Sequence, residues 1–385
     1  MKKVKFASLK GVKLASLAMA CLVAATAVAG CSGGSDKIKI GLVAPLTGDS
    51  GVMGESQRRG YEMAMGEINA AGGVNGKTLE LLTYDDQGDP QKAASGAQKF
   101  ADDKSVLAIG GSCNSSSTLA MIPIIDAGKL PDLVVSSSSA ALTGASEYFF
   151  RMSVQDAAVG PLMADALLGM GKKNVVVLYP NNDYGKGLNE SISARMTEQG
   201  GQILSSLTYQ ATDQDFTAQL TTVRNLFPDA IALAGTPTDS GLLIKQIRQM
   251  GIQVPLIGGT GLYNAKTIEI CGDASEDLIV IGVYVASNPD PKVRELVDKY
   301  VAKYNQEPDG FAALAYDQMY VIAEAAKSAM SEGGGAVTRE TLAAALKKTA
   351  YDGVTGDVSF NEVNDWVRPY LTLTVKDGSF VMFEG

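Results

Sequence analysis

The 385-residue chain contains no histidine. Histidine is the usual general base for serine and cysteine nucleophiles and the commonest zinc ligand in proteins. The sequence also lacks the G-x-S-x-G pattern that places a nucleophilic serine on the sharp turn of an α/β-hydrolase. These absences argue against a hydrolase, although the abundant serines leave a Ser-Lys or Ser-acid pair as a rival interpretation.

Basic residues are outnumbered by acidic ones. The chain carries 33 lysines and arginines against 42 aspartates and glutamates, a formal net charge of −9 at pH 7. Five of the lysines fall within the first 30 residues, so the rest of the chain is more acidic still. An acidic chain without a basic run binds nucleic acid and anionic lipid surfaces poorly. We therefore expect no nucleic-acid partner.

Cysteine is scarce. Of four cysteines, Cys21 and Cys31 fall near the N-terminus, which leaves only Cys113 and Cys271 in the body of the chain. An exported protein could oxidise these two to a disulfide. Because they occupy predicted loops in what we expect to be different lobes, two free thiols are the favoured interpretation.

The first 30 residues have the layout of a secretory signal. Five lysines and no acid precede a largely apolar run over residues 14–29, which is short for a membrane span of about 20 residues. The run ends in VAGC, residues 28–31, which resembles a bacterial lipobox, whose cysteine receives a diacylglycerol and becomes the new N-terminus.

We therefore expect a lipoprotein signal peptide over residues 1–30, lipidation at Cys31 and a lipidated tether over residues 31–36. These features predict an extracytoplasmic protein that is anchored to the cell membrane by its lipid. An uncleaved anchor helix, or an ordinary signal with an incidental cysteine, is the alternative interpretation.

After residue 36, short β-rich segments alternate with segments of helical spacing. The first half has expected strands at 37–46, 77–86, 105–111 and 130–137, with helices at 56–71, 90–103 and 115–127. After residues 148–156 the rhythm restarts, with strands at 173–180, 202–209, 229–235 and 254–259 and helices at 187–198, 216–225 and 239–250. Such alternation is typical of βαβ units on a parallel sheet. The sequence thus predicts an α/β protein with two similar halves, each with its own sheet.

The C-terminal part breaks this rhythm. A further strand at 277–285 leads into helices near 291–304, 310–330 and 338–348, and residues 367–383 then alternate around Asp377-Gly378 like a hairpin. The helices could form a third domain, but a chain that crosses back to finish each lobe is more economical. We therefore expect lobe 1 to comprise residues 37–154 plus 287–360, and lobe 2 to comprise residues 155–286 plus 361–385.

Small hydroxyl side chains gather where two expected neighbouring strands end. GGSCNSSST, residues 110–118, lies between a strand and a helix, and VVSSSSAALT, residues 134–143, follows the next strand. The first amides of a helix lack internal partners and, with the helix dipole, can bind an anion, although such serines also serve as caps and turns. Ligands of open α/β sheets bind outside the carboxyl ends of the strands. The two clusters therefore predict a shared polar pocket wall.

The segment IGLVAPLTGDSGVMGESQRRGYEMAMGEINAAGG opens a series that continues through GSCNSSST, AALT, FRMSVQDAAVGP and YGKGL. This ordered series resembles the branched-chain amino-acid-binding proteins, the extracytoplasmic receptors of ABC importers, over essentially the whole chain after the leader. The resemblance implies the type I periplasmic-binding-protein fold, with two lobes joined by three crossover segments, each lobe a mostly parallel sheet flanked by helices. It implies a ligand held in the cleft and no enzyme activity, cofactor or metal.

The resemblance also assigns roles to residues. Ser115 would hold the ligand's α-carboxylate through its hydroxyl and the local amides. Ser136 would offer its carbonyl to the α-ammonium, and Ser138, where the family commonly has threonine, would add its hydroxyl and amide. Tyr184 matches a second-lobe aromatic that covers the ligand, and Tyr316 matches a tyrosine that lines the cleft.

Some positions depart from the Leu/Ile/Val receptors. Thr260 stands where those receptors have a glutamate that balances the ammonium, while Met53 and Thr236 replace tyrosines. A buried ammonium without a partner is costly, so Asp156 at the lobe crossover, or Asp317, would have to supply the charge. Otherwise the ligand is a carboxylate without an amine. Either aspartate could instead be a helix cap or a solvated surface residue.

We therefore interpret the chain as a monomeric, lipid-anchored receptor that captures a small aliphatic or branched-chain amino acid and delivers it to ABC permease subunits with their ATPases. The alternatives among binding proteins are receptors for amine-free aliphatic or aromatic carboxylates, urea or short amides. From other classes, a ligand sensor and a serine-dependent hydrolase stay open.

Overall fold

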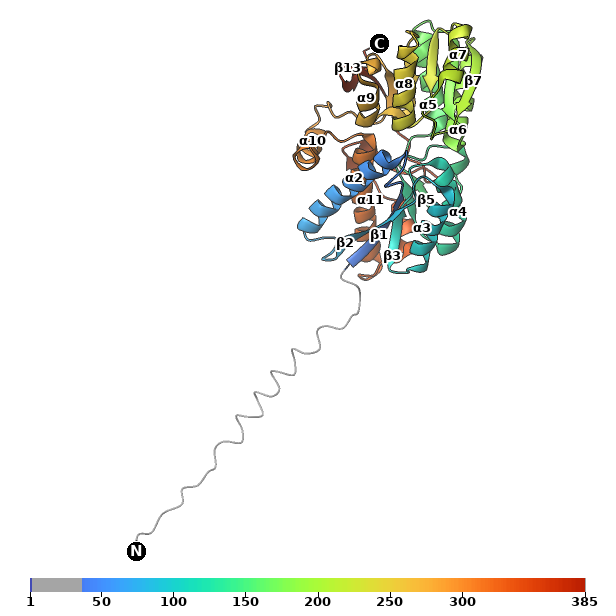
Figure 1. Cartoon of the computed structure of the whole chain (residues 1–385). Coiled ribbons are helices and arrows are strands. Elements are labelled where there is room, and N and C mark those ends of the chain that lie inside the picture. The colour runs from blue at the N-terminus through green and yellow to red at the C-terminus, as the bar shows by residue number, and fades with distance from the viewer. Residues whose placement is uncertain (2–36, 385) are drawn as a thin grey trace. The chain divides into compact units, whose positions relative to one another are not determined.

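A computed structural model of the protein describes residues 37–384, together with Met1. The predictions of a signal peptide, of lipidation at Cys31 and of a tether lie outside the described residues. From Lys37 onward the chain forms one compact unit. Within this unit, two sheets of separate strands define two lobes, drawn one above the other in Figure 1.

The first lobe is built on a five-stranded parallel sheet in the order β2-β1-β3-β4-β5. Its inner strands β1, β3 and β4 are apolar runs largely buried on both faces, as parallel sheets between helices require, whereas the edge strand β2 is only partly buried. The elements of this part are β1 (Lys37–Ala44), α2 (Gly51–Ala70), β2 (Thr78–Asp85), α3 (Pro90–Asp102), β3 (Val106–Gly110), α4 (Ser115–Gly128), β4 (Asp132–Val134), η1 (Ala140–Leu142) and β5 (Phe149–Arg151).

The second lobe is built on a seven-stranded sheet in the order β14-β13-β10-β9-β8-β6-β7, which is parallel except at β13 and β14. Helices lie on both of its faces (Figure 1). Its first elements are α5 (Asp156–Gly169), β6 (Asn174–Pro180), α6 (Asp183–Glu198), β7 (Gln202–Tyr209), α7 (Thr217–Leu226), β8 (Ala230–Leu233), α8 (Pro237–Gln249), β9 (Leu256–Gly258), η2 (Thr260–Leu262), α9 (Ala265–Cys271), η3 (Gly272–Ser275) and β10 (Ile279–Gly282).

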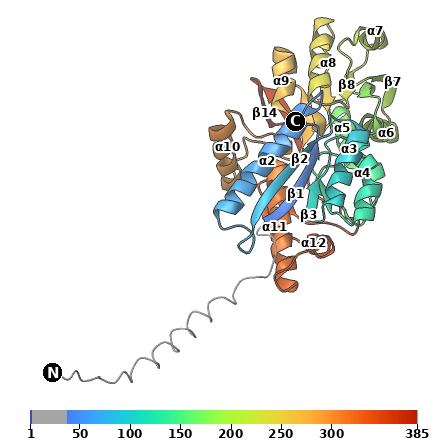
Figure 2. The ribbon, with the colours of Figure 1, turned by 60° about the horizontal axis from the view of Figure 1, so that its bottom comes forward.

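After β10 the chain returns to the first lobe. The elements of this return are α10 (Pro291–Tyr304), α11 (Gly310–Glu332), α12 (Arg339–Leu346), β11 (Tyr351–Gly353) and β12 (Gly356–Val358). Helix α11 packs along α2, and the two lie side by side in both ribbon views (Figures 1 and 2). Gly60 permits this approach, because a Cβ on it would lie 2.2 Å from the carbonyl oxygen of Ala312.

The chain then crosses once more and ends in the second lobe. Strands β13 (Leu371–Lys376) and β14 (Ser379–Met382) form the predicted antiparallel hairpin, and β13 pairs with β10. Asp377 and Gly378 both have positive φ angles, 49° and 74°, as a tight hairpin turn requires. The α/β class with two separate, mostly parallel sheets is thereby confirmed. The division into residues 37–154 plus 287–360 and residues 155–286 plus 361–385 stays a prediction.

Several elements differ from the sequence-based expectation. Helix α2 begins at Gly51, five residues before the expected start, and β4 is shorter than the apolar run around it. The expectation placed no element over α5, whose sequence contains Gly160 and Pro161. Pro161 is the sixth residue of the helix, beyond its first turn, so it leaves the carbonyl of Ala157 without the usual i→i−4 donor.

Candidate functional site

The carboxyl ends of the strands carry the predicted site residues to one cleft. In the first sheet the strand order reverses at β1, and in the second it reverses at β6, and such switch points are where open α/β sheets bind ligands. Each of six predicted residues follows the end of a different strand, namely Met53 after β1, Ser115 after β3, Ser136 after β4, Tyr184 after β6, Thr236 after β8 and Thr260 after β9.

These six residues line a single cavity. Its wall combines residues of both lobes: Met53, Cys113, Asn114, Ser115, Ser116, Ser136, Asn182, Tyr184, Thr236, Thr260, Gly261 and Phe311. Most of the wall groups are uncharged hydrogen-bonding groups, with Met53, Cys113 and Phe311 as the apolar part. Three other predicted residues, Ser138, Asp156 and Tyr316, are not part of this wall.

The hydroxyl side chains that follow β3 and β4 divide into two groups with different roles. Ser137 donates to the carbonyl oxygen of Ser112 at 2.9 Å, and Thr118 bonds both that carbonyl, at 3.1 Å, and the Ser137 hydroxyl, at 2.7 Å. These three residues are fully buried and satisfy one another, so their role is structural. Ser115 and Ser116, by contrast, line the cavity.

Ser115 joins the start of α4 to the second serine segment. Its hydroxyl oxygen accepts from the amides of Ser138, at 3.3 Å, and Ser139, at 3.2 Å. The Ser138 amide is therefore already engaged, and its assignment to the ligand is not supported by this geometry. Because both contacts use the Ser115 oxygen as acceptor, its proton can still be donated to a ligand in the cavity. The first amides of α4, which lack intrahelical acceptors, begin at the same residue.

A buried ion pair fixes the second serine segment from behind. Arg151 is fully buried and donates to both carboxylate oxygens of Asp365, at 2.8 and 2.6 Å. The same guanidinium donates to the carbonyl of Ser139 at 2.9 Å and to the hydroxyl of Thr143 at 2.6 Å. A planar guanidinium with several fixed donors is well suited to this, so Arg151 positions the loop that faces the cleft.

Asp156 is a buried carboxyl that adjoins that loop. It opens α5, is 1% exposed, and its amide donates to the carbonyl of Ser138 at 3.0 Å. One of its carboxylate oxygens, Oδ2, has no hydrogen-bond partner among the described residues. Burial raises its pKa to about 7, although the neighbouring Ser138 hydroxyl and the charge of Arg151 favour the ionised form. Asp156 is therefore neither a solvated surface residue nor fully satisfied.

The Tyr184 hydroxyl is a second polar group without a partner. A Cβ on Gly259 would lie 2.9 Å from this oxygen and one on Gly261 would lie 3.1 Å from it, so glycines make room for the phenol. Burial and the nearby Asp156 raise the pKa of Tyr184, which keeps the phenol neutral. Unpartnered buried hydroxyls are also present on Ser136 and Ser138. Since such groups are costly, their concentration around the cleft indicates a polar ligand.

Two aromatic and acidic candidates serve elsewhere. The Tyr316 hydroxyl donates to Glu67 at 2.6 Å, on the face where α11 packs against α2. Asp317 accepts from the amides of Val354 and Thr355 at 3.0 and 2.8 Å and so anchors the short β11–β12 turn. Both side chains are engaged in holding the C-terminal elements to lobe 1, away from the cavity wall.

Cys113, Asn114 and Ser116 belong to the segment 110–118 that was predicted as pocket wall, although they were not assigned individually. The wall residues that the sequence reasoning missed are Asn182, Gly261 and Phe311. Asn182 caps α6 by accepting from the Gly185 amide at 2.8 Å. Its position directly after a strand, at the start of a helix, was the available signal. Phe311 carried no such signal because it comes from α11, far along the chain. Cys113 and Cys271 are both free and buried.

Hydrogen bonds join the two lobes beside the cavity. The Ser116 hydroxyl donates to the Asp183 carboxylate at 2.6 Å, and the Thr238 hydroxyl donates to the carbonyl of Asp49 at 2.9 Å. Farther along the cleft, the Asn264 amide donates to the Asp309 carboxylate. These hydrogen bonds hold the two lobes together across the cleft, and they would break if the lobes separated.

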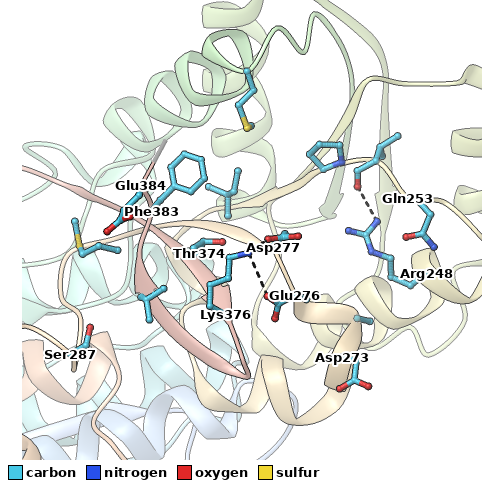
Figure 3. Close-up of a pocket in the computed structure, with 17 residues that line it drawn as sticks. Arg248, Gln253, Asp273, Glu276, Asp277, Ser287, Thr374, Lys376, Phe383 and Glu384 are labelled. Carbon is cyan, nitrogen blue, oxygen red and sulfur yellow. Dashed lines mark hydrogen bonds and ion pairs between the residues drawn. The ribbon is translucent and has the colours of Figure 1, made fainter.

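A larger groove, of about 1150 Å³, lies along the second sheet and has a different character (Figure 3). Lys376 pairs there with Asp277 and, at 3.5 Å, with Glu276. The Arg248 guanidinium donates to the carbonyls of Ile252 and Val254, each at 2.9 Å. Because the Lys376 and Arg248 side chains already have partners and, apart from Ser287, only the second lobe lines the groove, it is a weaker candidate for a ligand site than the cleft.

Among residues 37–384, no helix has both the length and the apolar content needed to cross a membrane. The same residues contain no group of three or more cysteine, aspartate or glutamate side chains arranged to hold a metal ion.

Comparison with known proteins identifies the family. A family model described as periplasmic binding protein matches residues 37–379. The leucine-, isoleucine-, valine-, threonine-, and alanine-binding protein of Pseudomonas aeruginosa is 32% identical over 351 residues, which are 89% of this chain and 92% of that protein.

Solved structures agree with the fold. The branched-chain amino acid transporter substrate binding protein of Streptococcus pneumoniae, in complex with isoleucine, is 30% identical with a TM-score of 0.83, and the match covers 89% of this chain and 97% of that one. A solute binding protein of an ABC transporter from Rhodopseudomonas palustris BisB5, in complex with 3,4-dihydroxy benzoic acid, is 25% identical with a TM-score of 0.83 and covers 91% and 97%. The chain belongs to the periplasmic binding protein family, which consists of extracytoplasmic solute receptors rather than enzymes.

Proposed function

We propose that this protein captures a small amino acid with an aliphatic side chain between its lobes and delivers it, as a monomer, to the permease and ATPase subunits of an ABC importer. The observation that carries this proposal is the Asp156 carboxyl, which is buried at the start of α5 with one oxygen unpartnered. A buried carboxyl of this kind is costly unless a cation joins it. An α-ammonium group is such a cation.

The start of α4 would receive the other charged end of the ligand. Helix amides without internal acceptors and the positive end of the helix dipole favour an anion there. The Ser115 hydroxyl still has a proton to donate, so this part of the cavity wall suits a carboxylate. Ser136 and Ser138 contribute unpartnered hydroxyls between the two ends. Ser115 in the wall and the buried Asp156, which lies outside the wall but near Tyr184, would thus offer complementary groups to the two charges of a zwitterion.

Residues of the second lobe would complete the enclosure. Tyr184, Thr236 and Thr260 line the cavity together with the serines and Met53 of lobe 1. A ligand that contacts both lobes stabilises the closed arrangement over the open one, because only the closed arrangement offers both sets of contacts. The permease would then recognise the closed receptor.

A second candidate ligand is a carboxylate without an amine. Thr260 favours this candidate, because the position offers a hydroxyl and no negative charge where a carboxyl would balance an ammonium. The solute binding protein that was solved with 3,4-dihydroxy benzoic acid has the same fold. A protonated Asp156, whose pKa lies near 7, could then donate to the ligand instead of pairing with it.

We further propose that Cys31 is lipidated after removal of residues 1–30, so that the receptor stays anchored to the cell membrane. The basic and apolar leader that ends in VAGC supports this. Cells fed a radiolabelled or clickable fatty acid should label the wild-type chain but not a Cys31→Ser variant. Labelling of both forms would remove the anchor from the proposal.

The test of the function is thermal unfolding of the chain from Ser32 onward, which includes the whole compact unit. The ligands are the aliphatic amino acids, their deaminated keto acids and a set of aromatic carboxylates. A ligand at about 100 times its Kd adds roughly 2.7 kcal/mol of stability, which raises the midpoint measurably. We expect aliphatic amino acids to raise it and their keto acids to leave it nearly unchanged. A response only to amine-free carboxylates would favour the second candidate, and a response to none of these would refute both.

A further inference from the structure

A second, smaller chamber adjoins the ligand cavity. It has a volume of about 20 Å³ and shares three wall residues with the cavity, namely Ser136, Thr260 and Phe311. The rest of its wall consists of Val135, Ser153, Val154, Tyr263, Gly282, Val283, Gly310 and Leu314. Space of this size holds about one water-sized or methyl-sized group.

The chamber lies where the chain passes between lobes. Ser153 and Val154 belong to the segment between β5 and α5, and Val283 follows β10 on the way back to lobe 1. Phe311 and Leu314 come from the first turns of α11. Since two of the three crossover segments contribute to its wall, the chamber lies where the lobes are joined, next to the ligand cavity.

Its chemistry differs from that of the polar cavity. The side chains of Val135, Val154, Val283 and Leu314 are aliphatic and almost fully buried. Two hydroxyls stand apart from them, since Ser153, which is 3% exposed, and Ser136 each have a hydroxyl oxygen without a hydrogen-bond partner among the described residues. A largely aliphatic recess with a free hydroxyl at Ser153 and another at its neck, on Ser136, suits a short aliphatic group better than a charged or bulky one.

We propose that this chamber is the subsite for the end of the ligand's side chain, and that it limits the ligand to amino acids with short aliphatic side chains, with or without a hydroxyl. This inference rests on the proposed function, because it places the charged groups of the ligand at Ser115 and Asp156. The neck formed by Ser136, Thr260 and Phe311 then separates the polar end from the apolar end.

Glycine at position 310 keeps the chamber open. Gly310 has an ordinary φ angle, so alanine can be accommodated by the backbone, but its Cβ would lie 3.0 Å from Cδ1 of Tyr263. A Gly310→Ala substitution therefore narrows the chamber by one methyl group. Leu314→Ala widens it, and Ser153→Ala removes the hydroxyl with little change in volume.

The experiment measures Kd by calorimetric titration for alanine, valine, threonine, leucine and phenylalanine. One methyl group in an apolar subsite changes affinity by roughly tenfold or more. We expect Gly310→Ala to raise the Kd of leucine about tenfold, while the Kd of alanine changes less than about twofold. Leu314→Ala should improve phenylalanine relative to leucine, and Ser153→Ala should lower the affinity for threonine relative to valine.

Gly66→Ala is the matched control, because a Cβ on Gly66 meets nothing within 4 Å and should leave every Kd unchanged. Equal changes for all ligands in the three chamber variants, or no change in any, would overturn the subsite. A chamber that holds only a water would give that second result. If the wild type binds no amino acid at all, the proposed function fails first, so the two failures are distinguishable.

Discussion

Replacing Asp156 with asparagine should stabilise the ligand-free protein at pH 8 and abolish its response to an amino acid. The carboxyl is 1% exposed, and burial raises its pKa from 3.8 to about 7. An acid whose pKa is raised in the folded state stabilises the fold below its unfolded pKa, and this stabilisation is lost as pH rises through about 7. At pH 8 the native state therefore contains a buried, ionised carboxyl, which lowers the free energy of unfolding. Asparagine removes this destabilisation.

The magnitude follows from the shift. About three pKa units at 1.36 kcal/mol each correspond to a destabilisation by Asp156 of roughly 4 kcal/mol at pH 8. Only about 1.5 kcal/mol of this destabilisation remains at pH 5, where the native carboxyl is protonated. Other buried acids, such as Asp132 and Asp309, also have raised pKa values and make the wild type less stable as pH rises. Because both proteins contain them, they cancel in the difference between variant and wild type.

The assay is urea unfolding of both proteins at pH 5 and pH 8, followed by thermal unfolding with leucine. Asp165→Asn is the matched control, since Asp165 lies on the same helix but forms a surface pair with Arg195 at 2.8 Å. That control should show neither the stability gain nor the loss of ligand response. An Asp156→Asn protein that is less stable at pH 8, equally affected at both pH values, or still fully responsive to leucine would refute the reasoning.

Three further predictions concern contacts around the cleft. Ser116→Ala removes the bond to Asp183 across the lobes and should weaken all ligands alike by about 1 kcal/mol, seen as a faster dissociation rate; a change in ligand ranking would contradict a closure role. Asp365→Asn leaves Arg151 buried without its counter-charge and should lower the free energy of unfolding by about 3–5 kcal/mol in urea titrations, whereas a loss below 1 kcal/mol would contradict the buried pair. Ser115→Ala should weaken amino-acid binding by about 1 kcal/mol or more in calorimetry, and unchanged affinity would remove Ser115 from the site.

Local patterns were sufficient for most of the strands, though not for β5, β11 and β12, and for the serine part of the site. Serines that closely follow a strand lie at the carboxyl edge of its sheet, wherever the rest of the chain goes. The clusters after β3 and β4 could therefore be brought together in advance, whereas Met53, Tyr184, Thr236 and Thr260 were assigned from the family resemblance. Helix α5 was not predicted, because its sequence is apolar on most sides and so shows no apolar stripe with helical periodicity.

Contacts between distant segments could not be predicted in this way. Arg151 and Asp365 are 214 residues apart, and neither side chain's burial is visible in its local pattern. The wall of the chamber comes from two of the crossovers and from α11, so its existence depends on how the lobes meet. Tyr316 illustrates the opposite case, since one helical turn decides whether a side chain faces the cleft or, as here, Glu67 on α2.

Calorimetric titration of the chain from Ser32 onward with leucine and with its deaminated keto acid tests the central claim most directly. The account predicts that one leucine binds per chain and that the keto acid, which cannot pair with Asp156, binds at least about tenfold more weakly. A keto acid that binds as tightly as leucine would contradict recognition of the ammonium at Asp156.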